Sequence, residues 1–269
     1  MRSKLLQRYT YSLILLRELV ITDFKLRYQG SFLGYIWSLL RPLALFAILY
    51  LVFVRFLPAV SAAIPHYPVY LLFGIVIWNY FSEVTNGGVS AIVGRGDLIR
   101  KLNFPKYVIV LAGSFSALIN LGLNLVIVAI FAIFSGVDIS VGAIWAPLLI
   151  IELFIFSISV AFLLSALFVK LRDVNYIWEV IMQGAFYGTP IIYALNIIPL
   201  SAAKILILSP PAQIMQDLRH IIITPQAATI GTLYGSEWMR LVPLGFVVLF
   251  AVLSMWYFKK QSKHFAEEV

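Results

Sequence analysis

The sequence predicts an all-α membrane protein with six transmembrane helices, an N-terminal amphipathic interface helix and short re-entrant outer helices before the last span. Three observations lead to this fold class. Hydrophobic residues make up 62% of the 269 residues and charged residues only 12%, whereas about a quarter of an ordinary soluble domain is charged. The apolar residues fall in long runs, and the basic residues gather in alternate connections between those runs. A surface this apolar is expected to face lipid.

A helix that crosses the hydrocarbon core, which is about 30 Å thick, needs about 20 largely apolar residues. The chain offers six such segments: residues 33–57, 69–93, 107–134, 143–169, 174–198 and 241–258. Arg41-Pro42 interrupts the first near its start, and Pro190 lies inside the fifth. Only loops, one amphipathic segment and short tails lie outside these runs, so we expect a single transmembrane domain over residues 1–269.

The basic residues predict the orientation of the spans. One side would carry most of them: Arg2, Lys4, Arg8, Arg17, Lys25, Arg27, Arg41, Arg95, Arg100, Lys101, Lys106, Lys170, Arg172, Lys259, Lys260 and Lys263. The other side would carry only Arg55, Lys204, Arg219 and Arg240. Because Lys and Arg concentrate on cytoplasmic loops, both termini are predicted to lie in the cytoplasm. The same rule accounts for the net charge of +8 without nucleic acid.

An amphipathic helix is predicted over residues 11–29, before the first span. At 100° per residue its apolar side chains share one face and its polar side chains the opposite face. The apolar face holds Leu13, Leu16, Val20 and Phe24, and the polar face holds Glu18, Thr22, Lys25 and Gln29. Such a helix is too polar to cross the membrane, and we expect it to lie in the cytoplasmic interface. It is equally suited to packing on a partner protein.

Two further connections are predicted to contain short helices. Between Gly96 and Pro105 there is room for about two turns, and this segment suits either a cytoplasmic partner or an ordinary basic loop. On the outer side, residues 199–240 include a possible helix at 212–223 that carries Asp217 and Arg219. We expect short helices here that dip into the outer leaflet, where protein or water must cover irregular backbone.

The residue types argue against several kinds of chemistry. There is no cysteine, and the three histidines, His66, His220 and His264, lack metal-ligand spacing. No Gly-rich phosphate loop follows a strand, so we expect no nucleotide site and no cofactor in this chain. Glu83 and Glu152 fall inside predicted spans. Carboxylates at that depth are functional candidates, although hydrogen bonding between helices explains each of them as well.

Four stretches, in order along the chain, resemble a known family. They are Arg17-Glu18-Leu19 and Asp23 through Gly34, followed by Trp37 and Pro42; Gly74 and Trp78 with Leu98 through Lys106; Arg172-Asp173-Val174 with Thr189 through Tyr193; and Ser209 through Ala212 with Asp217-Leu218-Arg219. Together they are similar to the permease subunits of polysaccharide ABC exporters, which move O-antigens, teichoic acids and capsules. The resemblance covers nearly the whole chain.

The resemblance implies a multi-pass protein of the bacterial inner membrane that is not itself an enzyme. It implies a homodimer of this chain with two copies of a separate ATPase, which would hold the ATP and Mg. Residues 11–29 become the interface helix, and residues 96–105 become a coupling helix that docks on the ATPase. Its candidate contacts are Asp97, Leu98, Arg100, Lys101 and Phe104. A channel would form between the two copies, chiefly from the first and fifth spans.

The substrate implied is a glycan on an undecaprenyl-diphosphate-type lipid. We expect Lys25, Arg27 and Arg41, at the inner membrane surface, to attract its diphosphate, although they would equally hold anionic membrane lipids. Candidates for contact with the glycan are Tyr35, Trp37, Tyr187 and Tyr193, for which the alternative is a surface that faces lipid. Two rival functions are an exporter of small lipids or drugs, and a membrane-embedded glycosyl or acyl transferase.

Overall fold

The computed structural model describes residues 12–23, 25, 34, 36–62, 64–101, 104–138 and 140–268. All regular elements in these residues are helical, which confirms the predicted all-α class. In chain order the α-helices are residues 12–23, α2 (Ile36–Tyr50), α3 (Pro58–Ala62), α4 (Tyr67–Ser90), α5 (Gly96–Lys101), α6 (Tyr107–Phe134), α7 (Ala146–Lys170), α8 (Val174–Gly188), α9 (Leu200–Ile207), α10 (Pro210–Ile222), α11 (Ile230–Tyr234), α12 (Leu241–Gln261) and α13 (Phe265–Glu268). A π-helical turn, Leu51–Phe56, extends α2, and 3-10 turns occupy Val93–Arg95, Val141–Trp145, Leu195–Ile197 and Glu237–Arg240.

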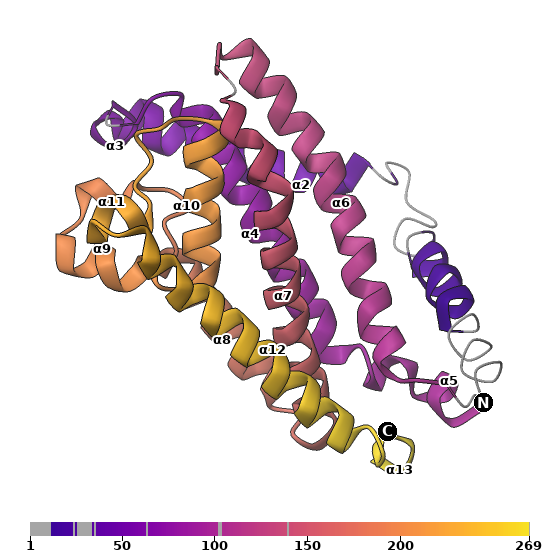
Figure 1. The fold of residues 1–269 in the computed structure, drawn as a ribbon. Coiled ribbons are helices and arrows are strands. Elements are labelled where there is room, and N and C mark those ends of the chain that lie inside the picture. Colours follow the sequence, from indigo (N-terminus) through magenta and orange to yellow (C-terminus); the bar gives the residue numbers. More distant parts are fainter. Residues whose placement is uncertain are drawn as a thin grey trace.

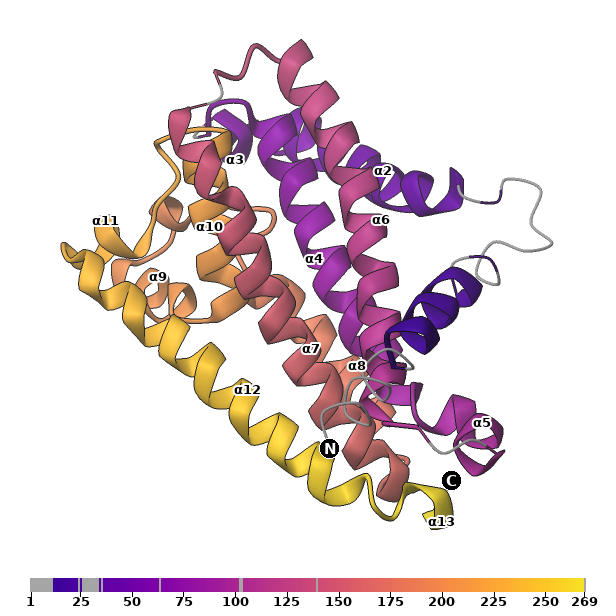
Figure 2. The ribbon, with the colours of Figure 1, turned by 45° about the vertical axis from the view of Figure 1, so that its right-hand side comes forward.

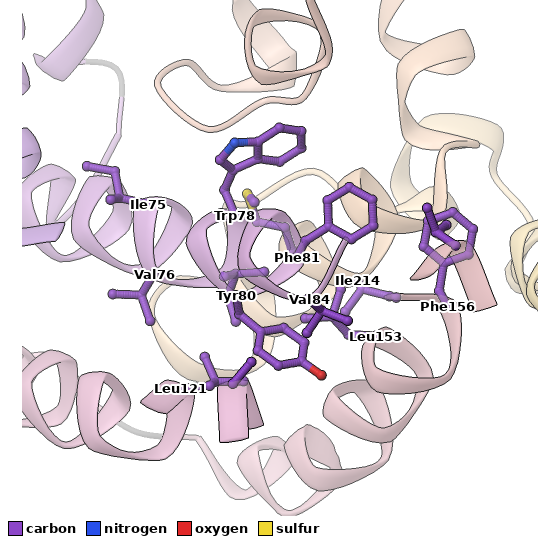
Figure 3. Close-up of a cluster of buried hydrophobic side chains, with 14 of the residues drawn as sticks. Ile75, Val76, Trp78, Tyr80, Phe81, Val84, Leu121, Leu153, Phe156 and Ile214 are labelled. Atoms are coloured by element: carbon purple, nitrogen blue, oxygen red, sulfur yellow. The ribbon is translucent and has the colours of Figure 1, made fainter. Parts of the chain in front are cut away.

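Helix α4 is the centre of the bundle, and it packs against α2, α6, α7, α8 and α10 (Figure 1). Every side chain from Val69 to Trp78 is buried, and Val69, Leu71 and Ile75 are completely inaccessible. Figure 3 shows Trp78 and Phe81 on one side of α4, with Val76 and Tyr80 on the side that faces α6. A helix segment buried on all sides contacts protein rather than lipid, and this segment of α4 is accordingly almost entirely apolar.

Four stretches of helix in the described residues are long and apolar enough to cross a membrane: Ile36–Phe56, Tyr107–Phe134, Val141–Lys170 and Glu237–Gln261. They match four of the six predicted spans. Helix α4 has 24 residues but includes Asn79, Glu83 and Asn86. The prediction of one helix over residues 174–198 was wrong at its end, because α8 stops at Gly188. The cause is Pro190, which disfavours helical backbone at the residue before it.

Helix α2 continues through Pro42, although the sequence placed an interruption there. A proline inside a helix cannot donate to the carbonyl four residues earlier, which here belongs to Ser38. The Asn124 side chain of α6 donates to that carbonyl, with 3.5 Å between Asn124 Nδ2 and Ser38 O. The proline therefore creates an acceptor through which α2 is attached to α6.

The two ends of the bundle differ. In both views α5 and α13 lie at one end, and the α6–α7 connection lies at the other (Figures 1 and 2). At the α5 end, Asp23 of the first helix forms an ion pair with Arg95. Phe265 of α13 is fully buried against Phe258 of α12, with ring centroids 5.4 Å apart. The first helix and the C-terminal helix are therefore both attached near α5.

The short helices α9, α10 and α11 form a side layer against α7 and α12 (Figure 2). Helix α10 confirms the helix predicted over residues 212–223. It begins at Pro210-Pro211, where proline fits the first turn because its missing N–H has no partner there. Its polar side chains are nearly inaccessible, with exposed fractions of 3% for Gln213, 0% for Gln216 and 0% for Arg219. A polar helix buried in this way must find its hydrogen-bond partners inside the protein.

Candidate functional site

A polar cavity of about 540 Å³ lies between α2, α4 and α6. It is lined by Gly34, Trp37, Ser38, Arg41, Pro42, Val76, Asn79, Tyr80, Ser82, Glu83, Asn86, Gly87, Asn120, Leu121 and Asn124. Asn120 Nδ2 donates to Glu83 Oε2 at 2.8 Å, which joins α6 to α4. Amides, a carboxylate and a guanidinium thus surround a space among helices that are otherwise apolar, so the space suits water or a polar ligand.

A second cavity of about 480 Å³ extends toward the α5 end. Glu83 and Gly87 line both cavities, and Asp23 and Arg95 line the second. Arg95 also donates to the Ile109 carbonyl at 3.4 Å, which fixes the guanidinium against α6. A series of polar groups therefore runs from the Asp23–Arg95 ion pair to the middle of α6.

The residues predicted for the lipid head group are only partly brought together. Arg41 is exposed and lines the first cavity. Lys25 is exposed and helical, and Arg27 lies outside the described residues. Of the two described side chains, Arg41 lines a cavity and Lys25 does not.

The residues predicted to contact the glycan fall in two places. Trp37 is 54% exposed and lines the first cavity, to which α8 contributes no residue. Tyr187 is 72% exposed at the end of α8, and the Tyr193 hydroxyl donates to the Tyr187 carbonyl at 3.0 Å. Tyr35 lies outside the described residues. The two tyrosines near the end of α8 therefore lie together, apart from Trp37.

Helix α8 presents a polar stripe on its accessible face. Asn175, Glu179 and Gln183 are all exposed, and their spacing of four residues places them in one row along the helix. Lipid would not solvate an amide and a carboxylate at this spacing. This face of α8 is therefore suited to water or to another protein surface.

A buried network around Arg219 was not predicted as a site. The guanidinium donates to the carbonyls of Pro190 at 2.5 Å and Ile191 at 2.7 Å, just beyond the end of α8. It also donates to the Tyr70 carbonyl of α4 at 2.8 Å and stacks on the Tyr70 ring, 3.5 Å from its centroid. Burial lowers the pKa of Arg219, but the ordinary value of a guanidinium is so high that it stays charged.

Tyrosines of α4 complete the same network. The Tyr67 hydroxyl donates to the Ile192 carbonyl at 2.9 Å, and the Tyr70 hydroxyl shares its one proton between Gln216 Oε1 at 3.1 Å and Tyr193 O at 3.4 Å. Four consecutive carbonyls, those of residues 190 to 193, thus accept from side chains of α4 and α10. Irregular backbone inside a bundle is stable only when its polar groups are satisfied in this way. The network therefore fixes the segment that follows α8.

The signal for this network was present in the sequence. Gly74, the Thr189–Tyr193 stretch and Asp217-Leu218-Arg219 belong to three separate stretches of the family resemblance, and the structure brings all three together. A β-carbon on Gly74 would occupy the space of the Arg219 guanidinium. Glycine is therefore the residue that lets Arg219 reach the backbone of α4.

Two acidic residues lie near the outer helices. Asp217 Oδ2 accepts from Gln213 Nε2 at 2.7 Å, and Asp217 Oδ1 lies 3.5 Å from Arg240 Nη2. Burial raises the pKa of the Asp217 carboxyl above its usual range, although Gln213, Arg240 and His220 act in the opposite direction. Glu152 of α7 is half-buried, and its Oε1 has no hydrogen-bond partner within the described residues.

The predicted ATPase contacts fall on both exposed and buried positions. Asp97, Arg100 and Lys101 are exposed on α5, and Leu98 is half-buried. Phe104 is only 4% exposed and belongs to the core of this chain. The three charged residues are therefore available to a partner, whereas Phe104 stabilises the end of the bundle.

Several long apolar helices define the class of the protein, a multi-pass membrane protein. The chain belongs to the ABC-2 type transporter family, whose model matches residues 15–223. It is 28% identical over 260 residues to the O-antigen export system permease protein RfbA of Myxococcus xanthus, with 95% of each chain covered. Two proteins of the same description from Klebsiella pneumoniae are 28% and 27% identical over 246 residues, with 91% of each chain covered.

Proposed function

We propose that this chain is the membrane-spanning subunit of an ABC exporter that moves a lipid-linked polysaccharide of the O-antigen type across the bacterial inner membrane. The observation that carries the proposal is the similarity to O-antigen export permeases over nearly the whole chain. The chain itself is not an enzyme in this proposal. Two copies of a separate ATPase bind ATP and Mg and drive the export.

Two copies of the chain form the transport path in this proposal. The exposed stripe of Asn175, Glu179 and Gln183 on α8 supports it, because these side chains need water or protein. Tyr187, which is exposed at the end of the same helix, adds an aromatic surface suited to the faces of sugar rings. A wet path between α8 and α2 of the two copies would hold a passing glycan.

The α5 end of the bundle faces the cytoplasm in this proposal. The exposed charges of Asp97, Arg100 and Lys101 would contact the ATPase, and Lys259 and Lys260 of α12 are exposed at the same end. Basic residues at this end accord with the orientation expected from the charge distribution. Motion of the ATPase would reach the spans through α5 and the attached Asp23–Arg95 pair.

The substrate's diphosphate would bind to basic side chains near the start of α2. Arg41 is exposed at the mouth of the first cavity, and Lys25 is exposed nearby in the sequence. Replacing Lys25, Arg27 and Arg41 together with glutamine should abolish export while leaving assembly with the ATPase intact. Unchanged export would remove these residues from the substrate path.

Complementation tests the proposal as a whole. The source strain is deleted for this gene and supplied with the wild-type chain or an empty vector, and surface polysaccharide is compared with lipid-linked polysaccharide retained inside. We expect the glycan to accumulate inside only with the empty vector, and the chain to co-purify with an ATPase whose activity depends on it. Normal surface glycan in the deleted strain would overturn the proposal in favour of an exporter of small lipids or drugs.

A further inference from the structure

We infer that the cavity between α2, α4 and α6 is a sugar-binding site, which takes the first sugar of the lipid-linked glycan while Arg41 at its mouth takes the diphosphate. The inference rests on the proposed function, and it adds a recognition site inside each copy of the chain. It is carried by the residues that line the cavity, by their position along the helices and by one buried hydroxyl without a partner.

The cavity has the chemistry that sugar hydroxyls require. Each hydroxyl donates one hydrogen bond and accepts others, and carboxamides and carboxylates offer matching groups in one plane. Four carboxamides line the cavity, those of Asn79, Asn86, Asn120 and Asn124, together with the Glu83 carboxylate. Its volume of about 540 Å³ falls within the range of about 300–1,000 Å³ that is typical of small-ligand sites.

The lining residues form two matched rows. On α4, Asn79, Glu83 and Asn86 follow one another at intervals of four and three residues, which places them on one face. On α6, Asn120 and Asn124 are four residues apart. The hydrogen bond from Asn120 to Glu83 joins the two rows. The polar groups are therefore held by rigid helices rather than by loops.

The depth of the cavity argues for a polar occupant. Asn120 and Asn124 lie near the middle of α6, a helix of 28 residues that is long enough to cross the membrane. The two side chains are only 9% and 7% exposed. Burying such groups at this depth is costly unless they are hydrogen-bonded. Pairing with each other and with Ser38 satisfies part of their capacity, and hydroxyls of a ligand would satisfy more.

Tyr80 supplies an independent observation. It lines the cavity beside Leu121, is 2% exposed, and its hydroxyl has no hydrogen-bond partner among the described residues. Figure 3 shows its ring on the opposite side of α4 from Trp78 and beside Leu121, with the hydroxyl pointing away from Leu121. An unsatisfied buried hydroxyl costs free energy, and because this oxygen has almost no accessible surface, a ligand in the cavity would satisfy it only after the ring turns toward the cavity.

The charges of Glu83 and Arg41 favour different places for the diphosphate and the sugar of the ligand. Glu83, at the inner wall, would repel a phosphate, whereas the Arg41 guanidinium would attract it. Arg41, Trp37 and Asn86 are exposed, so the cavity opens beside them. Trp37 at this opening offers an aromatic face to the apolar side of a sugar ring. The arrangement favours a diphosphate at the mouth and a neutral sugar within.

The test measures dissociation constants with the permease–ATPase complex in lipid nanodiscs. The two probes are lipid-linked glycan extracted from the source strain and undecaprenyl diphosphate, which has no sugar. We expect wild-type complex to bind the glycan lipid at least about tenfold more tightly, the ratio for one or two hydrogen bonds. Asn120→Leu and Asn86→Leu should remove that preference without weakening the binding of undecaprenyl diphosphate.

Two variants keep the result interpretable. Asn86 is exposed and hydrogen-bonded to Ser82, so its replacement leaves the core packing intact even where Asn120→Leu affects folding. Asn196→Leu makes the same chemical change at an exposed position outside the cavity and should keep the preference.

The remaining outcomes contradict either the sugar site or the proposed export function. A wild-type complex that binds both lipids equally overturns the sugar site and leaves the proposed export function standing on complementation. Cavity variants that weaken both probes equally also overturn it, because the cavity would then serve the diphosphate or the packing of helices. Failure of wild-type complex to bind either probe, together with failed complementation, would instead overturn the proposed function.

Discussion

The guanidinium of Arg219 occupies the space beside Gly74 that a β-carbon would fill. Arg219 lies on α10 and Gly74 on α4, and the contact lets the guanidinium donate to the Tyr70 carbonyl one helical turn earlier. The same guanidinium holds the Pro190 and Ile191 carbonyls. The absence of a side chain at Gly74 therefore allows Arg219 to attach the segment after α8 to α4, the centre of the bundle.

Substitution of Gly74 with alanine should destabilise the protein. The added methyl group must displace Arg219 or shift α4 from α10, and overpacking of this kind costs about 1–3 kcal/mol. The measurement is the thermal unfolding of the purified protein in detergent. Gly122→Ala on α6 is the matched control, because a β-carbon there meets nothing within 4 Å. Equal unfolding temperatures for the two variants would contradict the close contact.

Replacement of Arg219 with methionine should have a larger effect. It leaves the Pro190 and Ile191 carbonyls without their donor, and a buried unsatisfied acceptor costs about 1–3 kcal/mol. We expect a loss of about 3 kcal/mol or more in the free energy of unfolding, and faster labelling of a cysteine introduced at Ala194, which is buried. Arg172→Met removes an exposed guanidinium and should change stability little. Unaltered labelling at position 194 would show that Arg219 does not hold this segment.

The pH dependence of stability should reveal the buried Asp217. Because burial raises its pKa in the folded protein, folding favours the protonated form, and this stability is lost as the pH rises through the raised pKa. Asp217→Asn, which imitates the neutral acid, should be at least as stable as wild type at pH 7. The difference should shrink as the pH falls toward the ordinary aspartate pKa of about 3.9.

Unfolding temperatures measured across this pH range test the assignment. Asp138→Asn is the control, because Asp138 is exposed and is not among the groups that shift the pKa of Asp217. It should unfold with the pH profile of wild type. A variant Asp217→Asn that is less stable than wild type at pH 7 would mean that the ion pair with Arg240 outweighs the cost of burial.

Hydrophobic length was a sufficient signal for part of the fold. The helix over residues 107–134 was predicted with its observed bounds, because no charge occurs between Lys106 and Asp138. The last span, predicted over 241–258, was correct at its start and three residues short at its end. Hydropathy failed after Gly188, since it counts apolar side chains and carries no information on which groups satisfy the backbone. The donors for residues 190 to 193 come from α4 and α10, far away in sequence.

The candidate site was predicted only in part for a similar reason. Arg41 was predicted from its charge near the interface helix and Trp37 from its aromatic ring, and both line the first cavity. Asn120 and Asn124 were missed, because a single amide in a long apolar run is a weak signal. Their spacing of four residues was the informative feature. It becomes significant only when the matching row on α4 is placed opposite, which needs the tertiary structure.

The charged face of α5 yields the last prediction. Reversing Arg100 and Lys101 to glutamate together should weaken co-purification with the ATPase and lower ATPase-coupled export, because both side chains are exposed and neither stabilises the core. The thermal unfolding temperature of the permease alone should stay at the wild-type value.

Phe104→Glu should instead lower the unfolding temperature of the permease, because a charge replaces a ring that is only 4% exposed. Lys259→Glu/Lys260→Glu reverses two exposed charges on α12 and serves as the control for charge alone. If this pair weakens the complex as much as the α5 pair does, binding depends on overall charge at this end of the bundle, and α5 is not the specific contact.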